Sequence, residues 1–271
     1  MIGGVGAGIS SGVSSGVSSG VTANAEILLR CHALSRRWGG LLAVNQVSLE
    51  LQRGSLHAVI GTNGAGKSTL INLLSGEVPP SEGRVELLGH DVTDWPQPKR
   101  ARAGLGRSYQ RSTIFPSFSV LENCRLAAQA RTPKPWLWWQ DAARCAQSVA
   151  AARAAAAQAG LTDLLDRSAG SLSHGQKRQL EIAMCLATAP QVLLLDEPLA
   201  GMGAEETERM LALLIQLKAE HAVLLVEHDM DAVFRVADRI TVMVNGAVLA
   251  SGPPDLVRNS AEVRAAYLGE G

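Results

Sequence analysis

The sequence has few of the features that would let a chain cross a membrane or bind nucleic acid. Its 271 residues contain no run of 18 or more apolar residues, so we expect no transmembrane helix. Its 25 basic and 25 acidic residues balance, and aromatic residues make up only 4%. Proteins that bind nucleic acid need a basic surface or aromatic side chains on which bases stack. These shortages argue against a nucleic-acid partner.

The sequence also lacks closely spaced cysteines. Its four cysteines lie far apart, at Cys31, Cys124, Cys145 and Cys185. Zinc sites and redox sites are typically marked by CxxC pairs, and small secreted proteins by many cysteines in a short chain. We therefore expect four reduced thiols of a cytosolic protein.

The first 25 residues contain neither a charged residue nor a solid apolar block, so they do not match a secretory signal peptide. Residues 10–21 are three copies of SSGV. A segment of this composition buries too little apolar surface to offset the entropy lost when it is ordered. We expect residues 1–25 to be a flexible tail and residues 26–271 to form the folded domain.

From residue 26 onward, short apolar runs alternate with helical patterns. Runs rich in Leu, Val and Ile occur at 55–60, 191–196, 222–228 and 240–250. Continuous apolar runs are typical of parallel strands that are buried on both faces. The segments 26–60 and 85–92 contain pieces that suit antiparallel pairing. The pattern predicts an α/β fold with a mostly parallel sheet and an antiparallel side sheet.

The stretch from about 111 to 173 contains helical patterns only. Apolar residues recur at helical spacing over 120–130, and 141–159 is rich in alanine. The prolines of TPKPW at 132–136 separate these segments, because proline cannot continue a helix. Since the stretch lies within the α/β pattern, we predict a helical subdomain inserted in the core.

A complete phosphate-binding loop follows the apolar run at 55–60. It reads GTNGAGKST and matches G-x-x-x-x-G-K-[ST], with a strand before it and a helix after it. We expect Lys67 to reach the outer phosphates and the hydroxyl of Ser68 to coordinate Mg²⁺. The predicted phosphate site consists of Gly61, Thr62, Asn63, Gly64, Ala65, Gly66, Lys67, Ser68 and Thr69.

Two carboxylates end the apolar run of VLLLDEP. Asp196 fits the acid on the Mg²⁺ side of a phosphate-loop enzyme, and Glu197 fits the residue that polarises the attacking water. His228 ends the next run, where it is either a structural histidine or a hydrogen-bond donor to the γ-phosphate. Gln110 follows the short segment GLGRSY, where its amide oxygen could reach Mg²⁺ or the water.

A second polar turn, LSHGQ at 172–176, lies far along the chain from the phosphate loop. Ser173 and Gln176 have the spacing of a capping box at the start of a helix over 174–187. A capping box does not explain Gly175, because glycine in the first helical turn costs stability. Gly175 is explained if an anion approaches the backbone at this helix N-terminus.

Together these motifs resemble the ATP-binding cassette family of transport ATPases over residues 26–271. LSHGQ is similar to the family's signature LSGGQ, and it occurs with a phosphate loop and VLLLDEP. The resemblance implies a RecA-like phosphate-loop NTPase core, the cofactors ATP and Mg²⁺, and hydrolysis of ATP to ADP and phosphate. It also implies head-to-tail pairing with a second ATPase subunit, of the same or a homologous chain. Ser173, Gly175 and Gln176 would then contact the partner's ATP.

The resemblance assigns further roles by position. Trp38 would stack on adenine, although it could instead be a core residue of the side sheet. Gln110 would ligate Mg²⁺ with Ser68 and Asp196 and would link the ATP site to the helical subdomain. The catalytic residues would be Glu197 and the switch histidine His228.

Two residues depart from the family pattern. Thr62 stands where a proline is usual, at a position that supplies backbone shape. Gly203 stands where many members carry an acidic residue that helps the two ATP sites communicate.

Several segments look like the subgroup of importers for branched-chain amino acids, among them RWGGLLAVNQVSLEL, PLAGMGAEET and the ending AAYLGEG. The resemblance implies an energy-coupling subunit, peripheral to the cytoplasmic face of a bacterial inner membrane. Its partners would be two membrane permease subunits and, indirectly, a periplasmic solute-binding protein. The alternatives are a urea or amide importer and a lipid or polysaccharide exporter. More remote are a soluble cassette ATPase without a transport role and a different phosphate-loop enzyme, which would leave LSHGQ unexplained.

Overall fold

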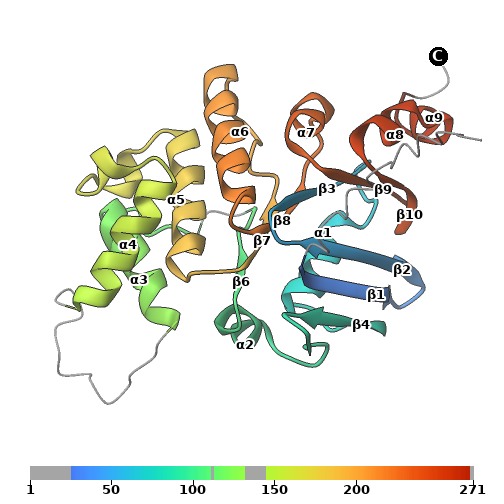
Figure 1. The fold of residues 1–271 in the computed structure, drawn as a ribbon, viewed down its shortest axis with the longest axis horizontal. Coiled ribbons are helices and arrows are strands. Elements are labelled where there is room, and N and C mark those ends of the chain that lie inside the picture. Colours follow the sequence, from blue (N-terminus) through green and yellow to red (C-terminus); the bar gives the residue numbers. More distant parts are fainter. Residues whose placement is uncertain (1–25, 111–112, 132–144, 269–271) are drawn as a thin grey trace, which may run out of the picture.

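The computed structural model describes residues 26–110, 113–131 and 145–268. The predicted tail at 1–25 and the proline-containing bend at 132–136 lie outside these residues. Two sheets, with helices between and around them, form the described part of the chain (Figure 1).

The central sheet has the strand order β10-β9-β3-β8-β7-β6. All neighbouring strands are parallel except β9 and β10, which pair antiparallel. The strands are β3 (Ser55–Gly61), β6 (Leu105–Arg107), β7 (Val192–Asp196), β8 (Ala222–Val226), β9 (Arg239–Val244) and β10 (Ala247–Gly252). The prediction of one continuous strand over 240–250 is wrong. Asn245 and Gly246 have left-handed backbones, with φ values of 49° and 83°, and they form the turn between β9 and β10.

The apolar run of β7 is buried on both faces of the sheet, as its composition predicts. Leu193 and Leu195 belong to the core cluster formed with the outer helices, whereas Val192 and Leu194 belong to the cluster on the opposite face. Alternate side chains of a strand point to opposite faces, so a strand covered on both sides is apolar throughout.

The second sheet is antiparallel, with the order β2-β1-β4-β5, and it is the side sheet expected from the sequence. Its strands are β1 (Ile27–Trp38), β2 (Leu41–Gln52), β4 (Glu82–Leu87) and β5 (His90–Asp91). Helix α1 (Lys67–Ser75) shares one core cluster with both sheets, because Leu70, Ile71, Leu73 and Leu74 are fully buried there. The helix that follows the phosphate loop is therefore held on two sides.

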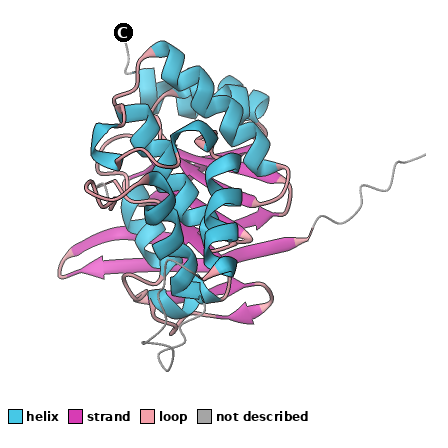
Figure 2. Ribbon diagram, turned by 90° about the vertical axis from the view of Figure 1, so that its left-hand side faces the viewer, coloured by secondary structure: helices cyan, strands magenta, loops and turns pink. Residues whose placement is uncertain are grey.

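Three helices form a group at one end of the molecule, and Figure 2 shows this group in front of the strands. They are α3 (Val120–Arg131), α4 (Ala146–Gln158) and α5 (His174–Ala187), and two short turns at Thr162–Leu164 and Ala169–Ser171 join α4 to α5. Small buried side chains such as Ala128, Ala152 and Ala183 let them pack closely. The other helices are α2 (Gln97–Arg102), α6 (Ala204–Lys218), α7 (Met230–Val236), α8 (Pro254–Asn259) and α9 (Ala261–Leu268). Among the described residues, every helix is too short or too polar to cross a bilayer.

Candidate functional site

The phosphate loop lies between β3 and α1, and its helix start is left open for an anion. Gly66 is the N-cap of α1 with a left-handed backbone (φ 98°), no side chain caps the helix, and its first turn has no acidic residue. A helix N-terminus carries unpaired N–H groups and the positive end of the helix dipole. An uncapped N-terminus of this kind suits a phosphate group.

Neighbouring segments hold the loop in shape. A Cβ at Gly66 would lie 2.3 Å from the carbonyl oxygen of Ala43, so only glycine fits at this position. The N–H of Gly246 donates to the carbonyl oxygen of Ala65 at 3.0 Å. The residues at the tip of the loop are exposed, namely Thr62, Asn63 and Gly64. Ser68, in the first turn of α1, is also exposed. The backbone of the loop is thus fixed by its contacts with Ala43 and Gly246, while the tip of the loop is open to solvent.

The ammonium group of Lys67 bonds to its own loop. Its Nζ donates to the carbonyl oxygens of Gly61 at 2.6 Å and Thr62 at 3.1 Å. Burial lowers the pKa of Lys67, and the nearby carboxylates of Glu197 and Asp196 act in the opposite direction. The lysine and both acids therefore lie within electrostatic reach of one another.

Asp196 ends β7 with a buried carboxylate. Its N–H donates to the hydroxyl of Ser108 at 3.1 Å, but its Oδ1 atom is buried without a hydrogen-bond partner among the described residues. Burial raises the pKa of Asp196, and the charge of Glu197 raises it further. A buried acceptor without a partner costs about 1–3 kcal/mol, which a cation or a bound water would relieve.

These residues fit a magnesium ion. Mg²⁺ usually takes one or two carboxylates together with phosphate oxygens and water. Asp196 supplies a buried carboxylate oxygen, and the exposed hydroxyl of Ser68 lies in the first turn of α1.

Glu197 has an unusual backbone. Its φ of +50° lies in the left-handed region, which non-glycine residues rarely adopt. Its N–H donates to the carbonyl oxygen of Val226 at 2.9 Å, and its side chain is half-buried. Such strain, of order 1–3 kcal/mol, persists only where the surroundings fix the conformation, and it is concentrated at functional sites.

His228 follows β8 and presents an exposed imidazole. Its side chain is 61% exposed, and its Nδ1 lies 3.7 Å from Oε2 of Glu227. This exposure favours the interpretation of His228 as a hydrogen-bond donor to a ligand over that of a structural histidine. Because β3, β7 and β8 are parallel neighbours, their carboxyl ends meet at one edge, which gathers Lys67, Asp196, Glu197 and His228.

Glu227, which precedes His228, belongs to this edge but was not predicted from the sequence. Its side chain is fully buried, and burial raises its pKa. Oε1 accepts from the N–H of Leu199 at 2.8 Å, and Oε2 accepts from the N–H of His228 at 3.2 Å. A carboxylate directly after an apolar run was the signal that could have found it.

Gln110 lies beyond β6 with an exposed side chain, and a second residue that was not predicted fixes its backbone. Arg178 of α5 donates from Nη2 to the carbonyl oxygen of Gln110 at 3.4 Å and from Nη1 to that of Tyr109 at 3.3 Å. Arg178 also pairs with the buried Glu181 at 2.9 Å. These bonds tie the Gln110 segment to α5, which carries the LSHGQ turn.

The LSHGQ turn forms the predicted capping box. The N–H of Gln176 donates to the hydroxyl of Ser173, and the N–H of Ser173 donates to the side-chain oxygen of Gln176. The helix runs over 174–187, as predicted. In the view of Figure 1, α5 lies on the side of α6 opposite to α1.

A carboxylate of the same chain approaches the backbone at Gly175. Oε1 of Glu206, on α6, accepts from the hydroxyl of Ser173 at 2.9 Å and from the N–H of Gly175 at 3.2 Å. A Cβ at Gly175 would lie 2.7 Å from Cδ of Glu206. The glycine does serve the close approach of an anion, as predicted, but the anion in this structure is Glu206.

Trp38 ends β1 on the surface. Its side chain is 49% exposed, and the guanidinium carbon of Arg36 lies 3.9 Å from its ring centroid. The alternative interpretation of Trp38 as a core residue of the side sheet is therefore wrong. An exposed indole offers a flat π surface to a ligand.

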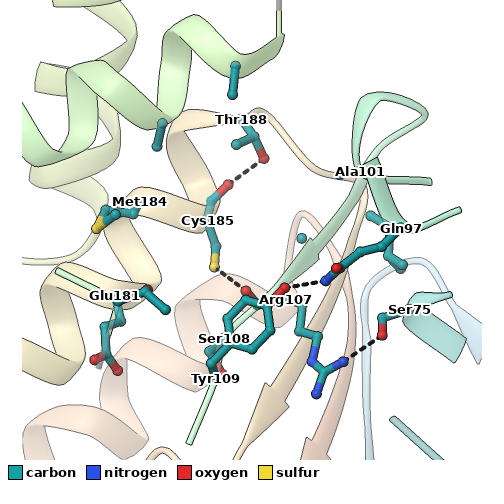
Figure 3. A pocket seen from close by; sticks show the side chains of 15 residues that line it. Ser75, Gln97, Ala101, Arg107, Ser108, Tyr109, Glu181, Met184, Cys185 and Thr188 are labelled. Atoms are coloured by element: carbon teal, nitrogen blue, oxygen red, sulfur yellow. Dashed lines mark hydrogen bonds between the residues drawn. The ribbon is translucent and has the colours of Figure 1, made fainter. Parts of the chain in front are cut away.

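A cavity of about 250 Å³ lies between the central sheet and the helical group (Figure 3). Its wall combines Gln97 and Ala101 of α2, residues 105–109, Ala127 and Ala130 of α3, Glu181, Met184 and Cys185 of α5, and Thr188, which caps the end of α5. The thiol of Cys185 donates to the carbonyl oxygen of Arg107 at 3.0 Å, and burial raises its pKa to about 12. The cavity is next to Ser108, whose hydroxyl contacts Asp196.

The chain is similar to transport ATPases over most of its length. A sequence model described as ABC transporter matches residues 44–200, and one described as branched-chain amino acid ATP-binding cassette transporter matches residues 247–271. The chain is 40% identical over 250 residues to the high-affinity branched-chain amino acid transport ATP-binding protein BraF of Pseudomonas aeruginosa, covering 90% of this chain and 98% of BraF. It is 41% identical over 251 residues to the protein LivG of Escherichia coli, which carries the same description, with the same coverage.

The fold is similar to those of solved ATP-binding cassettes. One is a nucleotide-free cassette from an ABC transporter, and another is the ADP conformation of such a cassette. Each gives a TM-score of 0.80 at 30% identity, and covers 90% of this chain and 100% of the solved chain. The predicted α/β phosphate-loop fold is thereby confirmed.

Proposed function

Because this chain belongs to the ABC transporter family and is an ATPase, we propose that its hydrolysis of ATP drives the import of branched-chain amino acids. The observation that carries the proposal is the 40% identity to BraF across 98% of that protein. The match of residues 247–271 to the branched-chain cassette model supports it. We assign this activity to residues 26–271, with residues 111–173 as a helical subdomain inserted in the ATPase domain.

The phosphate loop binds the nucleotide through backbone N–H groups and Lys67. When ATP arrives, Lys67 exchanges its bonds to Gly61 and Thr62 for the outer phosphate oxygens. Bound Mg²⁺, held by Ser68, Asp196 and the amide oxygen of Gln110, would neutralise phosphate charge. Partial burial of this edge strengthens each charge interaction because water is excluded.

The hydrolytic step belongs to the residues at the ends of β7 and β8. Glu197 accepts a hydrogen bond from the attacking water and draws its proton away as the water oxygen bonds to the γ-phosphorus. The bond between this phosphorus and the leaving oxygen of ADP then breaks. The exposed His228 donates a hydrogen bond to the γ-phosphate, where negative charge develops.

The second half of each ATP site comes from a second ATPase subunit. In this proposal the LSHGQ turn leaves Glu206 and donates from Ser173 and Gly175 to the γ-phosphate on the partner. The position of α5 on the side of α6 opposite to α1 in Figure 1 supports this, because it separates the turn at the start of α5 from the chain's own phosphate loop. Closure and reopening of the pair would move the attached membrane subunits.

Trp38→Ala is expected to weaken ATP binding by about 1–3 kcal/mol, the usual contribution of one stacked base. Trp38→Phe should retain most of the affinity, because it keeps a π face. Isothermal titration of each variant with ATP measures the change. The matched control is Leu41→Ala, which removes another exposed apolar side chain of the same hairpin. An equal loss in the Leu41 variant would contradict the stacking role.

We propose that the membrane partners are two permease subunits and that a permease segment docks at the cavity between the central sheet and the helical group. The cavity wall is largely apolar and joins α2, α3 and α5. Movement of a docked segment would shift Tyr109, which lines the cavity, and Gln110, which follows it. The carbonyl oxygens of both residues accept hydrogen bonds from Arg178. This arrangement puts the subunit at the cytoplasmic face of the inner membrane, with a periplasmic solute-binding protein as an indirect partner.

Ala130→Glu is expected to abolish co-purification with the permease pair, because it places a charge in the apolar wall of the cavity. Ala130 is exposed on α3, so the fold should tolerate the change. Pull-down of the permeases from a membrane co-expressing all subunits measures it. Ala154→Glu, at an exposed alanine of α4 outside the cavity wall, is the matched control and should assemble normally. Normal assembly of both variants would contradict the docking proposal.

The solute is tested by transport in vesicles that contain the whole assembly. ATP-dependent uptake of leucine, isoleucine and valine is expected, with no uptake of urea or short amides. Uptake of urea alone would favour the urea-importer alternative, and outward movement of lipid would favour the exporter.

A further inference from the structure

Glu227 occupies a position that the proposed mechanism has not used. It follows the last residue of β8, between the strand and His228, and its carboxylate is fully buried. Each oxygen accepts one backbone N–H: Oε1 from Leu199 at 2.8 Å and Oε2 from His228 at 3.2 Å. The two N–H groups belong to segments that follow different strands, β7 and β8.

The segment after β7 is the one that carries the strained residue. Glu197 has its φ of +50°, and its carbonyl oxygen accepts from the N–H of Ala200 at 3.2 Å, which closes residues 197–200 into a turn. The end of β8 holds this turn at two points. Val226 accepts from the N–H of Glu197 at 2.9 Å, and Glu227 accepts from the N–H of Leu199. A left-handed glutamate persists only when the structure around it prevents relaxation.

We propose that Glu227 is a positioning residue for hydrolysis, which holds the turn of Glu197 and the backbone of His228 in one fixed geometry. This inference rests on the proposed function, in which Glu197 polarises the attacking water. Glu227 is buried behind the edge and acts through the two residues that face the phosphate. A shift of about 1 Å in a reacting group lowers rates by ~10²-fold, so a turn that no longer holds Glu197 in place would slow hydrolysis.

The site requires a carboxylate specifically. Two N–H donors converge on the side chain, and a carboxylate is an acceptor at both oxygens. An amide of the same shape has one acceptor and one NH₂ donor, so the NH₂ end of a substituted glutamine would face an N–H group without an acceptor. The cost of a buried unpaired donor is about 1–3 kcal/mol, comparable to the strain that the contact restrains.

Glu227→Gln is therefore expected to lower the kcat of ATP hydrolysis by ~10-fold or more, while KM for ATP and ATP-driven dimerisation change little. The control is Asp238→Asn, a change from carboxylate to amide at the opposite end of the sheet. Asp238 accepts the N–H of Leu56 at 2.8 Å, so this variant should alter the melting temperature but not kcat. Steady-state phosphate release and thermal melting of the full-length chain give the measurements.

A double-mutant cycle separates positioning from general support of the fold. Since Glu227 acts partly through Glu197 and partly through His228, Glu227→Gln should have less than its full effect on single-turnover hydrolysis when Glu197→Gln is already present. An additive loss overturns the proposal, as does wild-type kcat in Glu227→Gln. A loss of kcat that is matched by losses of ATP affinity and melting temperature also overturns it, because it indicates a purely structural role.

Two further variants complete the test. If Glu227→Gln does not fold, Glu227→Asp keeps the charge and both acceptors but is one methylene shorter. Because it cannot span both N–H groups, it should lower kcat in the same way, and wild-type kcat in this variant overturns the proposal. Normal turnover in Glu197→Gln would refute the proposed role of Glu197 itself. Normal turnover in Glu227→Gln, with Glu197→Gln inactive, would refute only the inference about Glu227.

Discussion

Glu197→Gln is expected to lower steady-state ATP turnover by roughly 10²–10⁴-fold, the usual contribution of one general base. Glutamine has the same shape but cannot draw a proton from the attacking water. The backbone should keep its place, because the bonds from Glu197 to Val226 and Ala200 involve main-chain atoms only. ATP affinity should remain near the wild-type value, since Lys67 and the phosphate loop are untouched. Phosphate release by the assembled transporter, together with nucleotide titration, measures both quantities.

The matched control for this prediction is Glu205→Gln. Glu205 lies at the exposed start of α6, where it pairs with Arg209, and exposed pairs of this kind contribute little. Turnover should not change in this variant. Undiminished turnover in the Glu197 variant would show that another group activates the water.

Gly175→Asp is expected to abolish ATP-driven dimerisation and to leave ATP binding by the single chain intact. The new Cβ would meet Cδ of Glu206 at 2.7 Å, so α5 and α6 would have to shift apart. The added carboxylate would also repel both Glu206 and the γ-phosphate of the partner's ATP. In Figure 1, α1, which follows the phosphate loop, lies on the side of α6 opposite to α5, so the affinity of the loop for ATP should not change.

Dimerisation is best measured by sedimentation with and without ATP, in the Glu197→Gln background so that bound ATP persists. Gly203→Asp provides a control with the same chemical change, because a Cβ there meets no atom within 4 Å. That variant should still pair. Dimer formation by Gly175→Asp at the ATP concentrations that suffice without it would refute the role of the LSHGQ turn.

The parts of the site that sequence could predict are those set by local chemistry. The phosphate loop needs its glycines and lysine in a fixed order, and the capping box of Ser173 and Gln176 needs only residues three apart. The double-sided burial of β7 likewise follows from its own composition. The turn at Asn245 and Gly246 was also a local signal, since Asn-Gly is typical of tight hairpins, but the apolar residues on both sides obscured it.

The parts that could not be predicted depend on how distant segments meet. Nothing near Glu206 indicates that it will contact Ser173, because that contact exists only once α6 packs beside α5. Similarly, the two bonds of Glu227 require β7 and β8 to be neighbours in the sheet. The bonds of Lys67 to its own loop depend on backbone geometry that sequence alone does not specify.

In the proposed pair of ATPase subunits, the contact of Glu206 with the LSHGQ turn would compete with the partner's nucleotide. Every phosphate that docks on this turn must displace a carboxylate that already uses the same two donors. The apparent affinity of the turn for the partner's ATP is reduced by the fraction of molecules in which Glu206 is bound. Pairing without ATP would be disfavoured to the same degree, so this contact would raise the ATP concentration that the proposed pair needs before it closes.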